Sequence, residues 1–193
     1  MTLGESTRRL AATGLGGHIE FRLRVDPLAA TFHDDAFEAV VFAHCSWYFS
    51  SENVLLQTLR RVHPWARRLL FSEWDLQPTT LEQFAHVLAV TIQSQIEAFK
   101  PLSEANVRTP LSRSRVYRLL EEAGWRIDHK TAIDSSDLDD VRWKIDACLA
   151  ASVEDLPARL RTEVETQREV LQSLSVRGRV RSLGSYALVA ERG

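Results

Sequence analysis

Hydrophobic and polar positions along the chain alternate between a strand-like and a helix-like period. A continuous apolar run at residues 39–43, typical of a strand buried on both faces of a parallel sheet, is followed by a second at residues 69–71. Between them, the apolar positions of residues 55–62 fall on one helical face, and Ser50 or Ser51 can cap that helix. Strand, helix and strand with short connections predict a parallel crossover unit. The fold class is therefore α/β.

Further helical and strand-like segments follow in the second half of the chain. Gly124 stands where a helix commonly ends on a left-handed residue. We expect the last two strands to be separated by a helical insertion at residues 136–176. The predicted elements are helices at residues 84–99, 112–123, 138–149 and 160–174, and strands at residues 125–133 and 186–190.

The N-terminal segment predicts a short helix at residues 6–12 and a strand at residues 19–25, where apolar and polar positions alternate. The glycine cluster at residues 14–17 lies between them. It runs from a helix into a strand, which is the reverse of the strand-to-helix order that directs backbone N–H groups and a helix N-terminus at a ligand. We interpret it as a turn.

Length and charge limit the possible architectures and partners. At 193 residues the chain is long enough for one well-buried core, and we expect a single domain over residues 1–193. Lys and Arg number 24 against 26 Asp and Glu, so there is no basic excess of the kind that nucleic-acid or anionic-membrane binders show. We expect neither nucleic acid nor a membrane as a partner.

Cysteine usage and hydropathy indicate the compartment. Cys45 and Cys148 lie far apart in segments that face the core, which argues against a disulfide framework and against a metal site. The N-terminal segment up to Leu10 has no apolar core of the signal-peptide kind, and no apolar run reaches the roughly 20 residues that span a bilayer. The expected location is the cytoplasm.

The order of these segments resembles the class I S-adenosylmethionine (SAM)-dependent methyltransferases over nearly the whole length. Residues 16–26 resemble the family's third strand, and residues 36–44, followed by Trp47, Tyr48 and Phe49, resemble its fourth strand and the loop after it. Residues 55–62 and 68–73 resemble the next helix and the fifth strand. Residues 109–125 resemble a late helix and turn, and residues 185–192 the closing strand. The resemblance implies a Rossmann-like sheet with helices on both faces, and SAM as cofactor.

The family's glycine-rich cofactor turn and its first two strands have no counterpart, so the fold is expected to be N-terminally incomplete. In the family's sheet order the absent first strand would pair with residues 38–43, and its loss would leave an apolar strand edge with unpaired backbone groups. Three explanations stay open: the chain is truncated, another chain or a swapped segment fills the gap, or the fold has closed around it. We expect truncation.

By resemblance, Asp26 matches the position whose carboxylate accepts from the adenine amino group. Pro27 has no N–H for the adenine ring nitrogen, and Leu28 is the candidate donor in its place. The alternative is an Asp–Pro turn that ends a strand, and the residues do not decide between the two.

Ala43 and His44 end the central strand, where ligands of open α/β sheets bind. By resemblance they line the methionine part of SAM. His44 is also the candidate general base, because histidine titrates near neutrality, while a structural role is the alternative. A nucleophile–base pairing of His44 with Cys45 or Ser46 is discounted, since sequence neighbours rarely face each other productively.

Aromatic and acidic residues follow the same strand ends. Tyr48 is a candidate cofactor contact and Trp47 a candidate substrate contact, because aromatic faces stabilise a sulfonium or an ammonium group. Their alternative role is to pack a helix against the sheet. The carboxylates of Glu73 and Asp75 are expected near His44, with Glu73 and Trp74 as substrate contacts. Helix capping or exposure to solvent is the alternative role of these acids. The helical insertion, with Trp143, resembles a substrate lid in position only, and the alternative is an accessory helical pair that adds core.

The resulting hypothesis is a SAM-dependent methyltransferase acting on a small molecule, with poor cofactor binding by the chain as it stands. The alternative is a non-catalytic remnant that acts as an interaction or oligomerisation module, with a homodimer formed through the exposed strand edge or the helical insertion. Another doubly wound α/β enzyme is a weaker option. The residues do not identify the methyl acceptor.

Overall fold

The computed structural model describes residues 3–100 and 102–193, and the chain divides into two compact units, Met1–Thr31 and Phe32–Gly193. The grouping of all 193 residues into one domain stays a prediction. The smaller unit contains helix α1 (Leu3–Ala11) and the short 3-10 helix η1 (Gly16–His18). Gly14 lies in the turn between them, whereas Gly16 and Gly17 belong to η1, so only part of the cluster forms the predicted turn. Gly16 is required at its position, since a Cβ would lie 2.2 Å from the Ala11 carbonyl oxygen.

The strand expected at residues 19–25 is wrong. These residues form turns and irregular backbone, and their apolar side chains Ile19, Phe21, Leu23 and Val25 are exposed. A strand requires a neighbour to accept and donate its backbone hydrogen bonds, and the described residues of the smaller unit include no second strand. Alternation alone was therefore insufficient to produce a strand.

The larger unit is built on a four-stranded mixed sheet in the order β1-β2-β4-β3. Its strands are β1 (Phe37–Ala43), β2 (Ala66–Trp74), β3 (Trp125–Ile133) and β4 (Ser185–Arg192). β1 and β2 pair in parallel, and β4 runs antiparallel to both β2 and β3. The α/β class and the predicted parallel crossover are confirmed.

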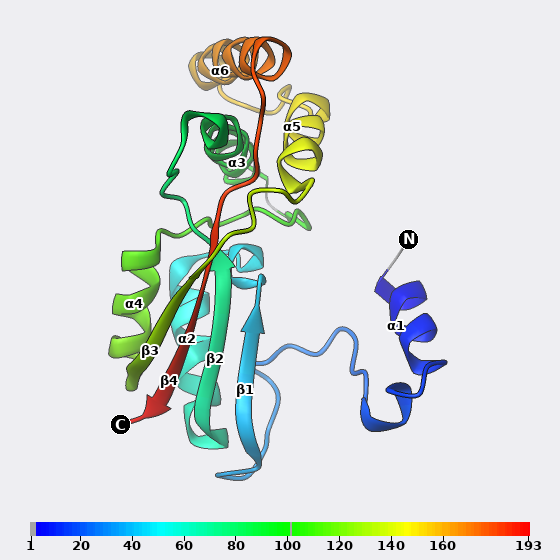
Figure 1. Cartoon of the computed structure of the whole chain (residues 1–193), viewed down its shortest axis with the longest axis vertical. Coiled ribbons are helices and arrows are strands. Elements are labelled where there is room, and N and C mark those ends of the chain that lie inside the picture. The colour runs from blue at the N-terminus through cyan, green and yellow to red at the C-terminus, as the bar shows by residue number, and fades with distance from the viewer. Residues whose placement is uncertain (1–2, 101) are drawn as a thin grey trace. The chain divides into compact units, whose positions relative to one another are not determined.

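One face of this sheet is covered by α2 (Glu52–Val62) and α4 (Arg113–Glu122), which lie behind it in Figure 1. Of the two candidate caps for α2, Ser51 is used, because its hydroxyl accepts from the Val54 N–H at 3.2 Å. The interface between these helices and the sheet is apolar. Burial of one Leu or Phe side chain stabilises the fold by roughly 1.5–3 kcal/mol. The buried members of the interface include Leu55, Leu59, Leu69, Phe71, Leu120, Trp125 and Leu188.

The remaining helices gather beyond the carboxyl ends of β1 and β2, at the top of Figure 1. They are α3 (Phe84–Glu97), α5 (Asp140–Ala150) and α6 (Ala158–Arg177), and α5 and α6 form the predicted insertion between the last two strands. A second apolar cluster holds them together, including Ile92, Ile96, Ile145, Cys148, Val164 and Leu171. No helix among the described residues has the length and apolarity needed to cross a bilayer.

β1 forms an open edge of the sheet within the larger unit. Val41 is 61% exposed, and Leu70, its partner on β2, is exposed as well. The edge predicted from the missing strand is thus present in the structure. The burial on both faces expected for residues 39–43 and 69–71 is wrong, because one face of both strands is exposed at Val41 and Leu70.

Candidate active site

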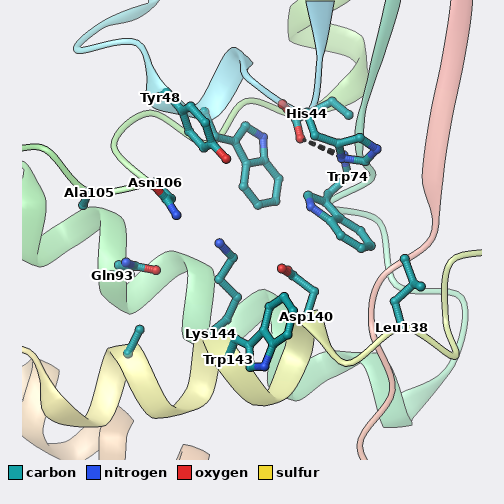
Figure 2. Close-up of a pocket in the computed structure, with 13 residues that line it drawn as sticks. His44, Tyr48, Trp74, Gln93, Ala105, Asn106, Leu138, Asp140, Trp143 and Lys144 are labelled. Carbon is teal, nitrogen blue, oxygen red and sulfur yellow. Dashed lines mark hydrogen bonds and ion pairs between the residues drawn. The ribbon is translucent and has the colours of Figure 1, made fainter. Parts of the chain in front are cut away.

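A cavity of about 670 Å³ opens between the carboxyl ends of β1 and β2 and the helices α3 and α5 (Figure 2). This is the position at which open α/β sheets bind their ligands. The side chains that line it come from the two strand ends, the loops after them and the two helices. They are His44, Trp47, Tyr48, Glu73, Trp74, Gln93, Ala105, Asn106, Leu138, Asp140, Trp143, Lys144 and Ala147.

His44 makes the turn that brings the chain into this cavity. Its N–H still donates to the Ser72 carbonyl at 2.9 Å, which continues the ladder between β1 and β2 by one residue. Its φ of 48° is left-handed, a conformation that costs a residue with a side chain roughly 1–2 kcal/mol. The chain then enters the 3-10 helix η2 (Ser46–Tyr48). Strained backbone of this kind is concentrated at functional sites.

Glu73 lies beneath His44 and is 1% exposed. Its Oε2 accepts from the Ser46 N–H at 3.0 Å and from the Ser46 hydroxyl at 2.7 Å, and its Oε1 accepts from the Trp74 N–H at 3.0 Å. Three donors thus satisfy the oxygens of this buried side chain.

The imidazole of His44 faces this carboxylate. Its Nδ1 lies 3.5 Å from Glu73 Oε1, shown by the dashed line in Figure 2, but has no hydrogen-bond partner among the described residues, and its side chain is 40% exposed. The tautomer with its proton on Nδ1 directs that proton at the carboxylate and leaves Nε2 as an acceptor. A histidine base with a carboxylate beside it is the arrangement used in general base catalysis.

Trp74 packs between two histidines. Its ring meets His44 edge to face, with centroids 5.1 Å apart, and meets the fully buried His86 in the same way at 5.4 Å. Trp47, at 2% exposure, also packs into an apolar cluster with Val90 and Val107 while bordering the cavity. The two roles considered for Trp47, wall and packing, therefore coexist.

Tyr48 and Cys45 stay protonated near neutrality. Burial, with a further contribution from the Glu73 carboxylate, raises the pKa of Tyr48. Burial and the same carboxylate raise the pKa of the Cys45 thiol to about 11. Because only the thiolate is nucleophilic, Cys45 is unsuited to covalent catalysis, in agreement with the sequence argument. Cys45 and Cys148 are both free.

The opposite wall carries Asp140, the first residue of α5. Its Oδ2 lies 3.1 Å from Nε2 of His86 on α3, and Nδ1 of His86 accepts the Leu183 N–H at 3.0 Å. Since Nδ1 is an acceptor, the ring proton is on Nε2 and faces the carboxylate. Partial burial acts to raise the pKa of Asp140, but the His86 contact and the Lys144 charge outweigh it and hold the pKa below its ordinary value.

Sequence reasoning located the strand-end residues but not the second wall. It missed His86, Gln93, Asn106, Asp140 and Lys144. A signal existed for the two charged residues, since Asp140 and Lys144 are four apart and share a helix face with Trp143 at the position expected of a lid. None existed for His86, a lone histidine within an apolar helix. Of the acids expected near His44, Glu73 is there.

The predicted adenine contacts lie in the smaller unit. Asp26 Oδ1 accepts the Leu28 N–H at 2.9 Å, so the Asp–Pro turn considered as the alternative is formed. The role of Asp26, Pro27 and Leu28 in cofactor binding stays a prediction. So do the cofactor contacts expected of Ala43 and Tyr48.

The residues of the larger unit match some of the features expected of a SAM site but not all of them. Aromatic rings and a strained turn surround the space where a sulfonium would be stabilised. No glycine of residues 32–193 stands between a strand and a following helix, however. Gly124 precedes β3, Gly178 and Gly184 lie between α6 and β4, and Gly193 follows β4. The described residues thus offer aromatic surface for the sulfonium, but residues 32–193 contain no glycine turn between a strand and a helix.

Comparison with solved structures relates this arrangement to known proteins. A cyclopropane-fatty-acyl-phospholipid synthase-like protein from Lactobacillus casei superposes with a TM-score of 0.80 at 27% identity, covering 99% of this chain and 69% of that one. Geranyl diphosphate methyltransferase in complex with SAM superposes at 0.50 and 15% identity, covering 97% and 63%.

A third structure shows how far this fold varies in function. The [4+2]-cyclase SpnF superposes with a TM-score of 0.50 at 15% identity, covering 98% of this chain and 60% of that one. No family model and no curated protein matches the sequence. Sheet order, the cavity beyond β1 and β2, and these superpositions agree: the chain has the fold of the class I SAM-dependent methyltransferases.

Proposed function

We propose that the cavity beyond β1 and β2 is the acceptor side of a SAM-dependent methyltransferase site that acts on a small molecule. The observation that carries this is the His44–Glu73 pair at the mouth of the cavity, 3.5 Å between Nδ1 and Oε1. SAM, when bound, supplies an electrophilic methyl group. The similar structures include methyltransferases, which supports this class of reaction over others.

His44 has the central role in this proposal. Its Nε2 takes the proton from an O–H or N–H of the acceptor, and the resulting imidazolium is stabilised by the buried Glu73 carboxylate below it. Trp74 and Tyr48 border the same space. Alignment of the reactants there lowers the barrier by several kcal/mol.

A methyl-transfer assay tests this proposal. The protein is incubated with methyl-labelled SAM and a pool of small-molecule extracts, and methylated products are identified by mass spectrometry. We expect His44→Gln to lower product formation by roughly 10²–10⁴-fold, the range for loss of a general base. His129→Gln is the control, because His129 lies on β3 away from the cavity. Equal loss in both variants, or none in His44→Gln, would contradict the proposal.

The open β1 edge favours a second candidate function, a module that associates with another copy of itself. A strand edge with exposed Val41 and unpaired backbone groups can pair with the same edge of a second chain. Light scattering over a range of protein concentrations tests this. We expect Val41→Lys to abolish a dimer and Val176→Lys, at the exposed end of α6, to leave it intact. A monomer at all concentrations would reject this function.

A further inference from the structure

Two opposite charges on α5 line the cavity without forming an ion pair with each other. Asp140 and Lys144 are one helical turn apart, and Figure 2 shows both side chains pointing into the space beneath Tyr48 and Trp74. Neighbours at this spacing commonly form an ion pair. Here no oxygen of Asp140 lies within 4.0 Å of the Lys144 nitrogen.

Asp140 is held by the protein on one side only. His86 occupies Oδ2, and His86 is itself fixed by the Leu183 N–H, so the carboxylate cannot turn away from the cavity without breaking a buried contact. Oδ2 lies 3.1 Å from Nε2 of His86, yet it is buried without a hydrogen-bond partner among residues 3–100 and 102–193. The carboxylate therefore retains acceptor capacity for a ligand.

Lys144 stands at the cavity wall as a half-buried charge. It forms neither a hydrogen bond nor an ion pair with any residue in the described part of the chain. Gln93, across the cavity on α3, carries a buried carbonyl oxygen without a hydrogen-bond partner among those same residues. The half-buried Lys144 ammonium calls for an anion, whereas the Gln93 carbonyl oxygen calls for a hydrogen-bond donor.

We infer that this cavity binds an α-amino acid head group, with its carboxylate against Lys144 and its ammonium against Asp140. A zwitterion satisfies both charges at once, whereas a ligand with a single charge leaves one of them uncompensated. Trp74 and Trp143 provide aromatic surface beside the ammonium and the side chain of the ligand. The inference rests on the proposed function of the same cavity and deepens it by naming what its second wall recognises.

Two molecules carry this chemistry: a free amino acid that accepts the methyl group, and the methionyl end of SAM. The second is of interest because the described residues lack the glycine turn that holds this end in the family. Two sets of ligands separate the two sources: phenyl compounds that carry both charges or only one of them, and adenosine thioethers with and without the amino-acid portion. They are L-phenylalanine, phenethylamine and 3-phenylpropionate for the free amino acid, and S-adenosylhomocysteine and 5′-methylthioadenosine for the cofactor.

Isothermal titration of the whole chain with these five compounds tests the inference. We expect at least one zwitterion to bind about tenfold or more tightly than its analogues lacking a charge, the factor given by one charge-assisted hydrogen bond of ordinary strength. Lys144→Gln should remove the gain in affinity that the carboxylate of the ligand gives. Asp140→Asn should remove the gain in affinity that the ammonium of the ligand gives. Lys144 is half-exposed, so its replacement leaves the fold intact even if Asp140→Asn does not.

Matched controls lie on the same helix or beside it. Arg142→Gln and Asp139→Asn change equivalent charges that do not line the cavity, and should leave the preference unchanged. Binding of the single-charge analogues as tightly as both zwitterions, or equal behaviour of Lys144→Gln and Arg142→Gln, would overturn the inference. No methyl transfer is measured, so this result and that of the His44 assay are independent.

Discussion

At the scale of single residues, the chemistry of the site depends on the hydrogen bonds that the Glu73 carboxylate accepts. Its three hydrogen bonds come from Ser46 and Trp74, and its remaining neighbour is His44. Sequence order alone places His44 and Glu73 at the ends of adjacent parallel strands, so their proximity could be predicted. The participation of Ser46 could not, because it depends on the left-handed turn at His44, which no sequence signal marks.

Glu73→Gln tests this network. The amide nitrogen of the new side chain would be a donor facing Ser46 or Trp74, which are also donors, so one buried group is left without a partner. We expect a loss of about 1–3 kcal/mol in the free energy of unfolding. Urea denaturation measures it, with Glu38→Gln on the exposed part of β1 as control. Equal stability of the two variants would show that the network contributes nothing.

At the scale of elements, periodicity predicted most of the larger unit. The strands β1 to β4 and the helices α2 to α6 stand where apolar runs or helical faces indicated, since their cores are built from those positions. At residues 19–25, periodicity alone predicts the wrong element. Their alternation has the period of a strand, but a strand forms only when a neighbour completes its hydrogen bonds, and that is a property of tertiary structure.

The start of α2 offers a direct test at this scale. Ser50 and Ser51 are adjacent and both fit the sequence preference for a cap, yet only the Ser51 hydroxyl accepts from Val54. We expect Ser51→Ala to lower the free energy of unfolding by about 0.5–2 kcal/mol. Ser50→Ala should change it by less than about 0.5 kcal/mol, as for other surface positions. Chemical denaturation of both variants decides, and a larger loss in Ser50→Ala would be incompatible with this cap.

At the scale of the whole molecule, the helical insertion closes the site. Its position over the strand ends depends on contacts between segments far apart in sequence, such as Asp140 with His86 and His86 with Leu183. Composition and periodicity carry no information on such contacts. The sequence therefore predicted the insertion but not the wall that it builds.

The Asp140–His86 contact makes a prediction for acid unfolding. The folded state holds the pKa of Asp140 below its ordinary value, so the carboxylate stabilises the fold above that value and the contribution is lost as the pH falls through the lowered one. Between about pH 5 and pH 3, we expect the stability of the wild type to fall more steeply than that of Asp140→Asn. Urea midpoints across this range measure the slopes. Asp139→Asn should retain the wild-type slope, and a parallel course of the wild type and Asp140→Asn would refute the assignment.

The central claim is that methyl transfer takes place in the cavity beyond β1 and β2. The most direct measurement is a titration of the isotopically labelled protein with S-adenosylhomocysteine, followed by heteronuclear NMR. The account predicts saturable shifts centred on His44, Tyr48, Trp74 and the start of α5, even if binding is weak. Shifts confined to the open face of the sheet around Val41 and Leu70, or no shifts at millimolar ligand, would contradict it.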